Sequence, residues 1–289
     1  MADAGQKSAE ELEALDVAYN VRRGVGEELF GRLMAEYRWS SERAVAGVPG
    51  TAGVVYDEAS GERLDVRGNP AGESRPVFVF VHGGYWKALS KDDSGFMAEM
   101  LHGQGIATVV PDYTLAPAVT LEEIIRQVRA AIAWVYLHGA AYGLDRDRIV
   151  VGGSSAGGHL TGVAMADDWQ AEFGVPADVV KAALPVSGLF DLRPLVDVYV
   201  NEWLGLDVPR AESLSPAFMP AARHCPAVVV VPEHDGSGFL DQSREFAARW
   251  PGAELLVVPG RNHFDVVLDL QGAETPISQA LLGLFRGLA

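Results

Sequence analysis

From residue 76 to its end, the chain alternates short apolar runs with segments of helical periodicity. The runs are apolar throughout, which is typical of strands that helices cover on both faces. They lie at 77–81, 106–110, 149–151, 182–186, 227–231 and 255–258. This alternation predicts an α/β fold with a mostly parallel central sheet and helices on both of its faces.

Helical spacing marks the segments between the runs. In 121–138 the apolar residues recur every three or four positions, as on one face of a helix. Further helices are expected near 93–103, directly after Ser155, before Trp250, and from about residue 276. At 289 residues the chain fits one large domain, and we expect 1–289 to fold as a single α/β unit.

Three segments depart from the alternation. Residues 1–45 contain helical spacing from 9 to 40 and predict an N-terminal helical arm. The runs 53–56 and 63–66, parted by a turn-rich segment, predict a β-hairpin. Residues 189–224 mix prolines, aromatic residues and short helical stretches between two core strands, and predict a lid insertion above the strand ends.

Charge and composition exclude several kinds of partner. The net charge of −16 disfavours nucleic acid and anionic membranes, and no apolar stretch approaches the roughly 18 residues of a membrane span. The N-terminus does not resemble a signal peptide, so a cytoplasmic location is expected. Cys225 is the only cysteine, and no Cys/His cluster has metal-ligand spacing. We therefore expect no metal and no cofactor; a homo-oligomer is compatible with the sequence.

A sharp glycine-rich turn at 153–157 reads Gly-Ser-Ser-Ala-Gly and follows a predicted strand. The pattern G-x-S-x-G places a serine at a strained strand-to-helix corner, where a Cβ on either outer glycine would collide with neighbouring backbone. Ser155 is the candidate nucleophile. The alternative is a plain glycine turn, since the pattern is short.

A serine nucleophile needs a base to take its proton. His263 follows the predicted strand 255–258 in a loop, and such loops collect at the strand ends where ligands bind. His159 lies one helical turn after Ser155 and is the weaker candidate, because its side chain would point along the helix flank.

The third partner is expected between the serine and the histidine in the chain. Asp235 follows the predicted strand 227–231, in a loop next to that of His263. Asp191 and Glu233 are rival carboxylates, although either could cap a turn or a helix.

Acyl transfer also needs donors for the developing oxyanion. The strand 77–81 ends in His-Gly-Gly-Tyr-Trp, and two successive glycines let backbone N–H groups approach a ligand. Gly83 and Gly84, with the amide of Ala156, are the candidate oxyanion donors. A purely structural glycine loop is the alternative.

Together these motifs resemble a known family. HGGYW (82–86), DYTLAP (112–117), GGSSAGGHL (152–160), GLFDLRPL (188–195) and NHF (262–264) occur in the order typical of the kynurenine formamidase (arylformamidase)-like branch of the α/β-hydrolases, which is related to hormone-sensitive-lipase-like esterases. The resemblance implies an α/β-hydrolase fold. It also implies the nucleophile Ser155, the acid Asp235, the base His263 and an oxyanion hole formed by Gly83, Gly84 and Ala156.

The expected function is a serine hydrolase that cleaves a small aryl formamide, with N-formylkynurenine as the substrate the resemblance suggests. Tyr85, Trp86, Tyr199 and Trp203 are candidates for an aromatic leaving-group pocket, although surplus aromatic residues also serve a core. Two alternatives remain: a carboxylesterase acting on small or biosynthetic esters, and a hydrolase-fold pseudoenzyme that binds a ligand without turnover.

Overall fold

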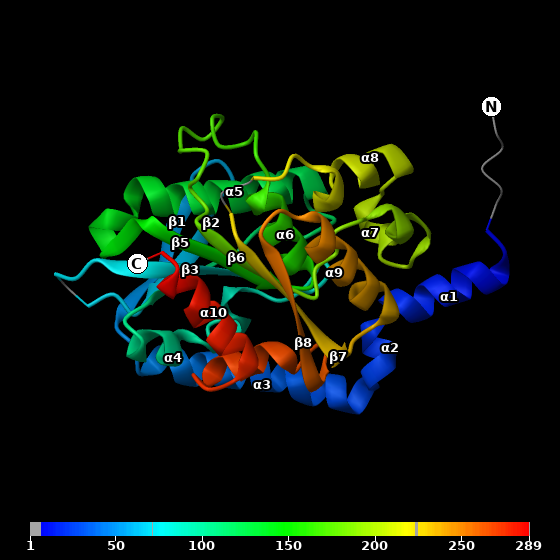
Figure 1. Cartoon of the computed structure of the whole chain (residues 1–289), viewed down its shortest axis with the longest axis horizontal. Coiled ribbons are helices and arrows are strands. Elements are labelled where there is room, and N and C mark those ends of the chain that lie inside the picture. Colours follow the sequence, from blue (N-terminus) through cyan, green and yellow to red (C-terminus); the bar gives the residue numbers. More distant parts are fainter. Residues whose placement is uncertain (1–6, 71, 223–224, 289) are drawn as a thin grey trace.

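The computed structural model describes residues 7–70, 72–222 and 225–288, and an eight-stranded sheet runs through its centre (Figure 1). The strand order is β1-β2-β4-β3-β5-β6-β7-β8; β1 and β2 pair antiparallel, β2 and β4 pair antiparallel, and the other pairs are parallel. The strands are β1 (Gly50–Asp57), β2 (Glu62–Arg67), β3 (Arg75–Val81), β4 (Ala107–Pro111), β5 (Leu144–Ser154), β6 (Ala182–Val186), β7 (Ala227–His234) and β8 (Ala253–Asn262). The predicted hairpin and mostly parallel sheet are confirmed.

Helices cover both faces of this sheet. Figure 1 shows α5 and α6 on one side and α4 and α10 on the other. The helices packed on the sheet are α4 (Ala98–Gly103), α5 (Leu121–His138), α6 (Ala156–Met165), α9 (Ser237–Arg249) and α10 (Pro276–Arg286), with short 3₁₀ turns η1 (Lys91–Asp93), η2 (Gly139–Tyr142) and η5 (Val266–Gln271). None of the helices within the described ranges combines the length and the apolar character that crossing a membrane requires.

Two apolar cores lie on opposite faces of the sheet, as strand β3 illustrates. Val77, Val79 and Val81 point into the core under α5, α6 and α9, whereas Phe78 and Phe80 point into the core under α4 and α10. Successive side chains of a strand alternate between faces, so both sets must be apolar when both faces are covered. Each such side chain contributes about 1.5–3 kcal/mol by leaving water.

The helix expected near 93–103 is shorter in the structure. A 3₁₀ turn ends at Asp93, and the α-helix begins only at Ala98. Gly95 lies against helix α3 (Glu27–Ala46): its N–H donates to Ser41 Oγ at 3.0 Å, and a Cβ on Gly95 would approach Val45 Cγ1 to 2.9 Å. This close contact between distant segments holds the backbone outside a regular helix.

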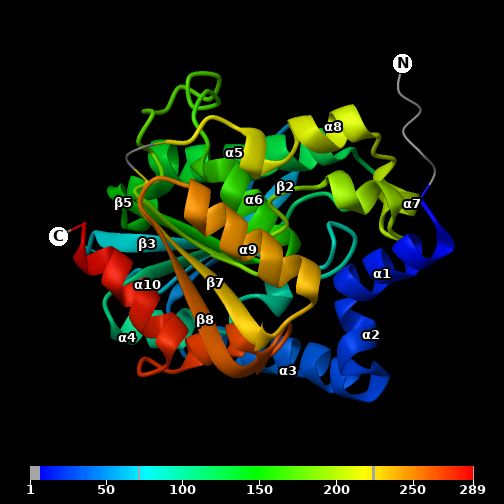
Figure 2. The ribbon, with the colours of Figure 1, turned by 45° about the vertical axis from the view of Figure 1, so that its right-hand side comes forward.

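The N-terminal arm folds as three helices, α1 (Ala9–Tyr19), α2 (Val21–Val25) and α3 (Glu27–Ala46). The segment expected to form a lid folds as η3 (Arg193–Asp197), α7 (Asn201–Leu204), α8 (Val208–Ser213) and η4 (Pro216–Phe218). Figure 2 shows α1, α2 and α7 at the same end of the molecule. Residues 1–6 of the predicted arm and 223–224 of the predicted insertion lie outside the described residues.

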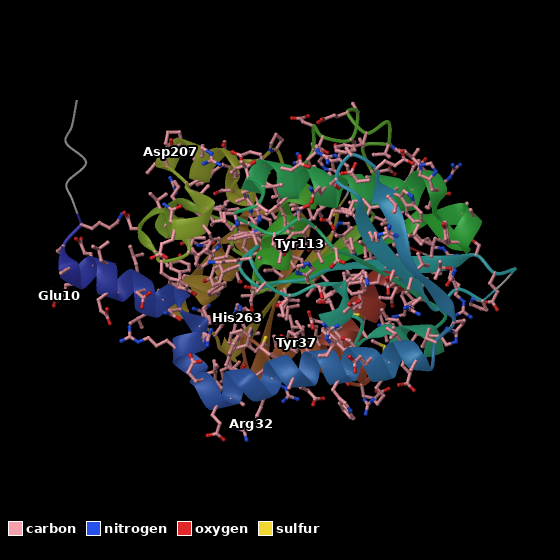
Figure 3. All side chains as sticks on the ribbon, turned by 180° about the vertical axis from the view of Figure 1, so that it is seen from behind. Glu10, Arg32, Tyr37, Tyr113, Asp207 and His263 are labelled. Carbon is pink, nitrogen blue, oxygen red and sulfur yellow. The ribbon has the colours of Figure 1, made fainter. Side chains whose placement is uncertain are left out.

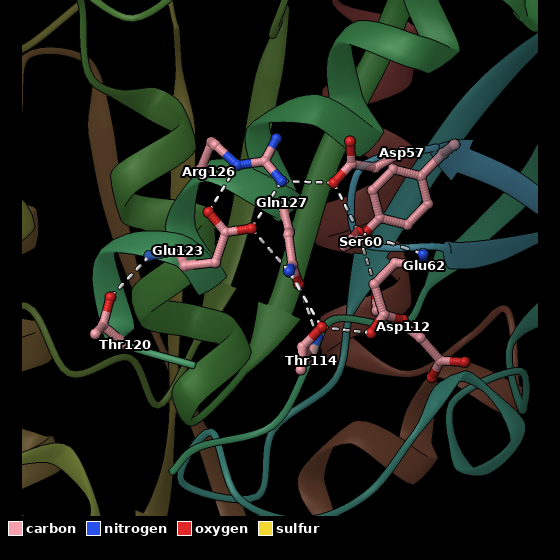
Figure 4. Close-up of polar contacts among 10 residues, drawn as sticks. Asp57, Ser60, Glu62, Asp112, Thr114, Thr120, Glu123, Arg126 and Gln127 are labelled. Carbon is pink, nitrogen blue, oxygen red and sulfur yellow. Dashed lines mark hydrogen bonds and ion pairs between the residues drawn. The ribbon is translucent and has the colours of Figure 1, made fainter. Parts of the chain in front are cut away.

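A polar network fixes the loop that follows β4 (Figure 4). Arg126 on α5 binds both Glu123 and Asp57, and Gln127 accepts a hydrogen bond from the N–H of Thr114 at 2.8 Å. The Thr114 hydroxyl in turn donates to a Glu62 carboxylate oxygen at 2.6 Å. The loop from residue 112 is therefore held against both the hairpin and α5.

Candidate active site

Ser155 occupies a strained corner between β5 and α6. Its φ of 58° and ψ of −116° lie in a region of backbone conformation that is disfavoured for residues other than glycine. A Cβ on Gly157 would lie 2.0 Å from the Val81 carbonyl oxygen, and one on Gly153 would lie 2.5 Å from the Gly157 carbonyl oxygen. Both outer glycines are therefore required by close backbone approach, as the sequence predicts.

His263 and Asp235 form a buried pair at the ends of two neighbouring strands. Asp235 comes directly after β7 and His263 directly after β8, which pairs with β7 in parallel. His263 Nδ1 lies 2.8 Å from an Asp235 carboxylate oxygen, and their side chains are 3% and 0% exposed. A carboxylate so placed fixes the imidazole orientation and leaves Nε2 as the free ring nitrogen.

Two further donors hold the Asp235 carboxylate. The Gly236 N–H donates to Oδ1 at 2.8 Å, and the Ser187 hydroxyl donates to Oδ2 at 2.6 Å. Both oxygens of this buried charge are thus hydrogen-bonded, as a buried charge requires. Ser187 was not among the residues predicted from the sequence; its position directly after β6 was the available signal.

The rival carboxylates lie elsewhere. Asp191 forms a partly exposed ion pair with Arg193, with two oxygens facing the guanidinium. Glu233 is exposed and accepts a hydrogen bond from the Gly260 N–H at 2.8 Å. Among the residues that the structure describes, His263 forms its ion pair with Asp235 and no hydrogen bond or ion pair with either rival, so the geometry favours Asp235 as the partner of the imidazole.

His159 is a core residue. It is fully buried, packs edge-on against Trp86, and its Nε2 lies 2.9 Å from the Leu214 carbonyl oxygen. Burial lowers the pKa of His159 to about 4. Its side chain is absent from the lining of the pocket described next, which argues against it as the base.

Ser155 and His263 both line a pocket of about 770 Å³. It opens at the carboxyl ends of the parallel strands, where ligands bind in open α/β sheets. Its walls come from the loop after β3, the turn at Ser155, α7, the loop after β8, and the arm helices α2 and α3. Within the described ranges, no group of three or more His, Cys, Asp or Glu side chains could hold a metal ion.

The loop after β3 presents two glycines to this pocket. A Cβ on Gly83 would lie 2.7 Å from the Ser154 carbonyl oxygen, and one on Gly84, whose φ is 93°, would lie 2.2 Å from the Ala88 carbonyl oxygen. Only glycine fits either position. Ala156 is the first residue of α6, where a helix N–H has no acceptor within its own helix. These amides are the candidate oxyanion donors.

Tyr113, which was not predicted as a site residue, holds the backbone of this loop. Its hydroxyl lies 3.1 Å from the His82 carbonyl oxygen and 3.2 Å from that of Gly83, so it can donate to either. Its ring stacks on the His82 ring at 4.1 Å. Burial lowers the pKa of His82 to about 4. The available signal was the motif DYTLAP (112–117), which contains Tyr113 and indicated only the family resemblance.

Three of the four candidate aromatic residues line the pocket. Tyr85, Tyr199 and Trp203 do so, and the Trp203 indole N–H donates to the Tyr85 carbonyl oxygen at 3.1 Å. Trp86 does not, because its side chain is 0% exposed and packs against His159. Tyr85 and Trp86 have successive positive φ values of 49° and 58°, a backbone conformation that is uncommon for residues other than glycine.

The N-terminal arm supplies a wall of the pocket that the sequence did not reveal. Phe30, Met34 and Tyr37 on α3 line it, together with Arg22 on α2. The Tyr37 hydroxyl donates to the Phe264 carbonyl oxygen at 2.5 Å, next to His263, and Figure 3 shows Tyr37 and His263 close to each other. The arm is therefore part of the site.

Comparison with known proteins places the chain in a family. A model of the BD-FAE family matches residues 64–249. A kynurenine formamidase of Salmo salar is 32% identical over 257 residues, which cover 84% of each chain. The chain belongs to the kynurenine formamidase-like α/β-hydrolase family. The relatives that the chain matches are hydrolases, and this protein is a hydrolase as well. The alternative of a non-enzymatic binding protein is not supported.

Solved structures agree with this family. A candidate thioesterase of Silicibacter sp. superposes with a TM-score of 0.81 at 30% identity, covering 93% of this chain and 98% of that one. An esterase of Pyrobaculum calidifontis superposes with a TM-score of 0.71 at 20% identity, covering 90% and 94%. At that identity the second likeness concerns the fold alone, and it confirms the expected α/β-hydrolase fold.

Proposed function

We propose that the protein is a serine hydrolase that cleaves a small aryl formamide through Ser155, His263 and Asp235. One observation carries the proposal: Ser155, on its strained corner, borders the same pocket as His263, which is paired with the buried side chain of Asp235. The similarity to kynurenine formamidases supports a formamide as substrate. The substrate is a small molecule, and no metal or cofactor enters the chemistry proposed here.

The first half of the reaction forms an acyl-enzyme. His263 Nε2 takes the Ser155 proton as Oγ attacks the formyl carbon, and the resulting imidazolium is stabilised by the Asp235 carboxylate. The amides of Gly83, Gly84 and Ala156 donate to the oxyanion of the tetrahedral intermediate. The imidazolium then protonates the amine nitrogen as the C–N bond breaks, so that the aryl amine leaves and Ser155 carries the formyl group.

The second half releases formate. Water enters where the amine was, His263 takes its proton, and the hydroxide adds to the formyl carbon. Collapse of this intermediate returns the proton from His263 to Ser155 Oγ and frees formate. Tyr85, Tyr199 and Trp203 would pack against the aromatic leaving group, and Trp86 is left out because the core covers it.

A substrate comparison tests the proposal. The ratio kcat/KM is measured for N-formylkynurenine, for formanilide and for phenyl esters of short acids, with formate release as a second readout. We expect the formamides to be turned over with the higher kcat/KM. Equal values on formamides and on unrelated esters would contradict specialisation for formamides.

A carboxylesterase is the second candidate, and the pocket's apolar side favours it. Phe30, Met34, Phe80 and Phe96 are among the residues that line the pocket of about 770 Å³, and a formyl group, with a single carbon, would bury little of this apolar surface. An acyl chain of several carbons would gain about 0.8 kcal/mol for each methylene buried there. A rise in kcat/KM from formate to butyrate esters of one phenol would therefore support this second function.

A further inference from the structure

The charged residues around the pocket have the opposite sign to the protein as a whole. The chain carries 39 acidic and 23 basic residues, yet the residues lining the pocket include three cationic side chains and one carboxylate. These are Arg22, Arg23, Lys87 and Glu27. Charge of one sign around a cleft draws in ligands of the other sign.

Two of the three cations already have carboxylate partners. The Arg22 guanidinium binds both oxygens of Glu27, and Arg23 pairs with Glu13 and Asp16. Their charges are largely matched within the arm. Among the described residues that line this pocket, Lys87 is therefore the lysine or arginine whose charge is left available to a ligand.

Lys87 differs from the other lysines of the chain. Of the four lysines in the sequence, Lys7, Lys91 and Lys181 each form an ion pair with an aspartate. No carboxylate in the described ranges lies within 4.0 Å of the Lys87 ammonium. It lies instead over the Trp203 ring, 4.1 Å from the centroid, an arrangement that orients a cation without neutralising it.

The backbone ties Lys87 to the reacting centre. Its N–H donates to the Gly84 carbonyl oxygen at 3.0 Å, and the next N–H, of Ala88, donates to the same oxygen at 3.1 Å. Gly84 is a candidate oxyanion donor, so this turn fixes the Lys87 backbone relative to the scissile bond. The Trp203 ring beneath the ammonium also lines the pocket.

We infer that Lys87 binds an anionic group, of the carboxylate class, on the part of the substrate remote from the scissile bond. With the aryl ring against Trp203, a carboxylate attached to it would reach the ammonium at the rim. Lys87 would then select acidic aryl substrates over neutral ones. The inference rests on the proposed hydrolysis at Ser155, but it holds equally for formamide and ester substrates.

Four kinds of substrate separate charge preference from bond type. The neutral formamide is formanilide, and the anionic formamides are its three ring-carboxylate isomers. The neutral ester is phenyl acetate, and the anionic esters are its three ring-carboxylate isomers. In the wild type we expect at least one carboxylate isomer to have the higher kcat/KM in whichever bond class is hydrolysed. Added salt should reduce this preference, because the rim is open to solvent.

Variants assign the preference to Lys87. In Lys87→Met the anionic-to-neutral ratio of kcat/KM should fall about fivefold, the scale of an exposed ion pair, mainly through KM. Lys87→Arg should retain most of the ratio. The matched control Lys181→Met removes the same charge at the start of β6, at the opposite end of the sheet from the pocket, and should leave the ratio as in the wild type.

The outcomes are separable. A preference for anionic esters that depends on Lys87, with formamides not hydrolysed, upholds the inference and contradicts the formamidase proposal. The inference is overturned if the anionic-to-neutral ratio of kcat/KM in Lys87→Met stays within twofold of the wild-type ratio. It is also overturned if the wild type shows no preference for anionic substrates. If no substrate is hydrolysed, direct binding of benzoate and benzamide decides: Lys87→Met should weaken benzoate alone, and equal effects on both ligands would contradict the role.

Discussion

The Ser187 hydroxyl donates a 2.6 Å hydrogen bond to Asp235 Oδ2, the carboxylate oxygen that does not bind His263. Ser187 is fully buried and has a φ of 47°, a backbone conformation that is unusual for residues other than glycine. It follows β6, the strand between those that carry Ser155 and Asp235. Ser187 thus adopts an unfavourable backbone conformation in the position from which its hydroxyl orients the Asp235 carboxylate.

Ser187→Ala should impair both stability and turnover. The substitution leaves one oxygen of a buried carboxylate without its donor, which costs about 1–3 kcal/mol of unfolding free energy. We expect kcat to fall by about three- to tenfold, because the carboxylate that orients the imidazole loses one of its own hydrogen-bond donors. Denaturant unfolding and steady-state kinetics measure the two effects, with exposed Ser213→Ala as the control; an unchanged kcat would show that Ser187 is structural only.

Asp235→Asn should distinguish the proposed acid from its rival. An amide in place of the carboxylate favours the wrong imidazole tautomer, and the comparable change in a known triad costs about 10⁴ in kcat. We expect a loss of about three to four orders of magnitude. Asp191→Asn removes a charge from the surface pair with Arg193 and should change kcat by less than about threefold. The reverse pattern in two folded variants would reassign the acid.

Ser155→Ala removes the proposed nucleophile. In comparable enzymes the loss is about 10⁶ in kcat, and covalent labelling by a fluorophosphonate probe should disappear with it. The neighbouring Ser154→Ala should still be labelled, because only Ser155 occupies the strained corner. Labelling of Ser155→Ala at the wild-type rate would place the reactive serine elsewhere.

Tyr113→Phe tests the support of the oxyanion loop. Its hydroxyl faces the carbonyl oxygens of His82 and Gly83, and its loss should let the loop amides drift from the oxyanion position. Because a direct oxyanion donor is worth about 10²–10³ in kcat, we expect about a tenfold loss with little change in KM.

Tyr56→Phe is the matched control for this change. The Tyr56 hydroxyl also donates to a backbone carbonyl oxygen, that of Asp112, at 2.7 Å, but it does not contact the oxyanion loop. It should lower stability and leave kcat nearly unchanged. If both variants lose kcat equally, Tyr113 acts through the general stability of its loop.

Acid should destabilise the protein partly through His159. Burial lowers the pKa of His159 to about 4 from an ordinary value of 6.5, so the unfolded chain binds a proton that the folded chain refuses. The contribution of neutral His159 to the free energy of unfolding is fully present above about pH 6.5 and is lost as the pH falls toward about 4. Each pH unit below 6.5 lowers the free energy of unfolding by about 1.4 kcal/mol, so the loss at about pH 5 is about 2 kcal/mol.

His159→Gln isolates this contribution. Glutamine keeps a donor for the Leu214 carbonyl oxygen and does not titrate. The unfolding free energy of the wild type, measured relative to this variant in urea, should decline by about 2 kcal/mol from pH 8 to pH 5. A difference that stays constant with pH would mean that His159 takes up its proton equally in both states.

The elements that could be predicted depend on residues close together in the sequence. The strand β3 is recognisable from Phe78 and its apolar neighbours, and the corner at Ser155 from two glycines that flank it. Turn chemistry and burial on both faces of a sheet leave such local patterns. For the same reason Asp235 and His263 could be proposed from their positions just after strands.

The misses depend on contacts between distant segments. The helix after Asp93 is shortened by the contact of Gly95 with Ser41, and Trp86 faces the core although its neighbour Tyr85 faces the pocket. Tyr113, although it lies within a quoted motif, was not recognised as a support because its hydroxyl contacts a loop thirty residues away in the chain.

The sequence by itself determined the α/β class, the strained serine corner and a short set of candidate partners, because periodicity and turn residues record local burial and backbone geometry. Only the tertiary structure decided that Asp235 rather than Asp191 meets His263, and that the arm encloses the pocket through contacts such as that of Tyr37 with Phe264. Packing brings together residues that can be more than two hundred positions apart in the chain, as Tyr37 and Phe264 are. No local sequence pattern encodes which of these distant residues will be in contact.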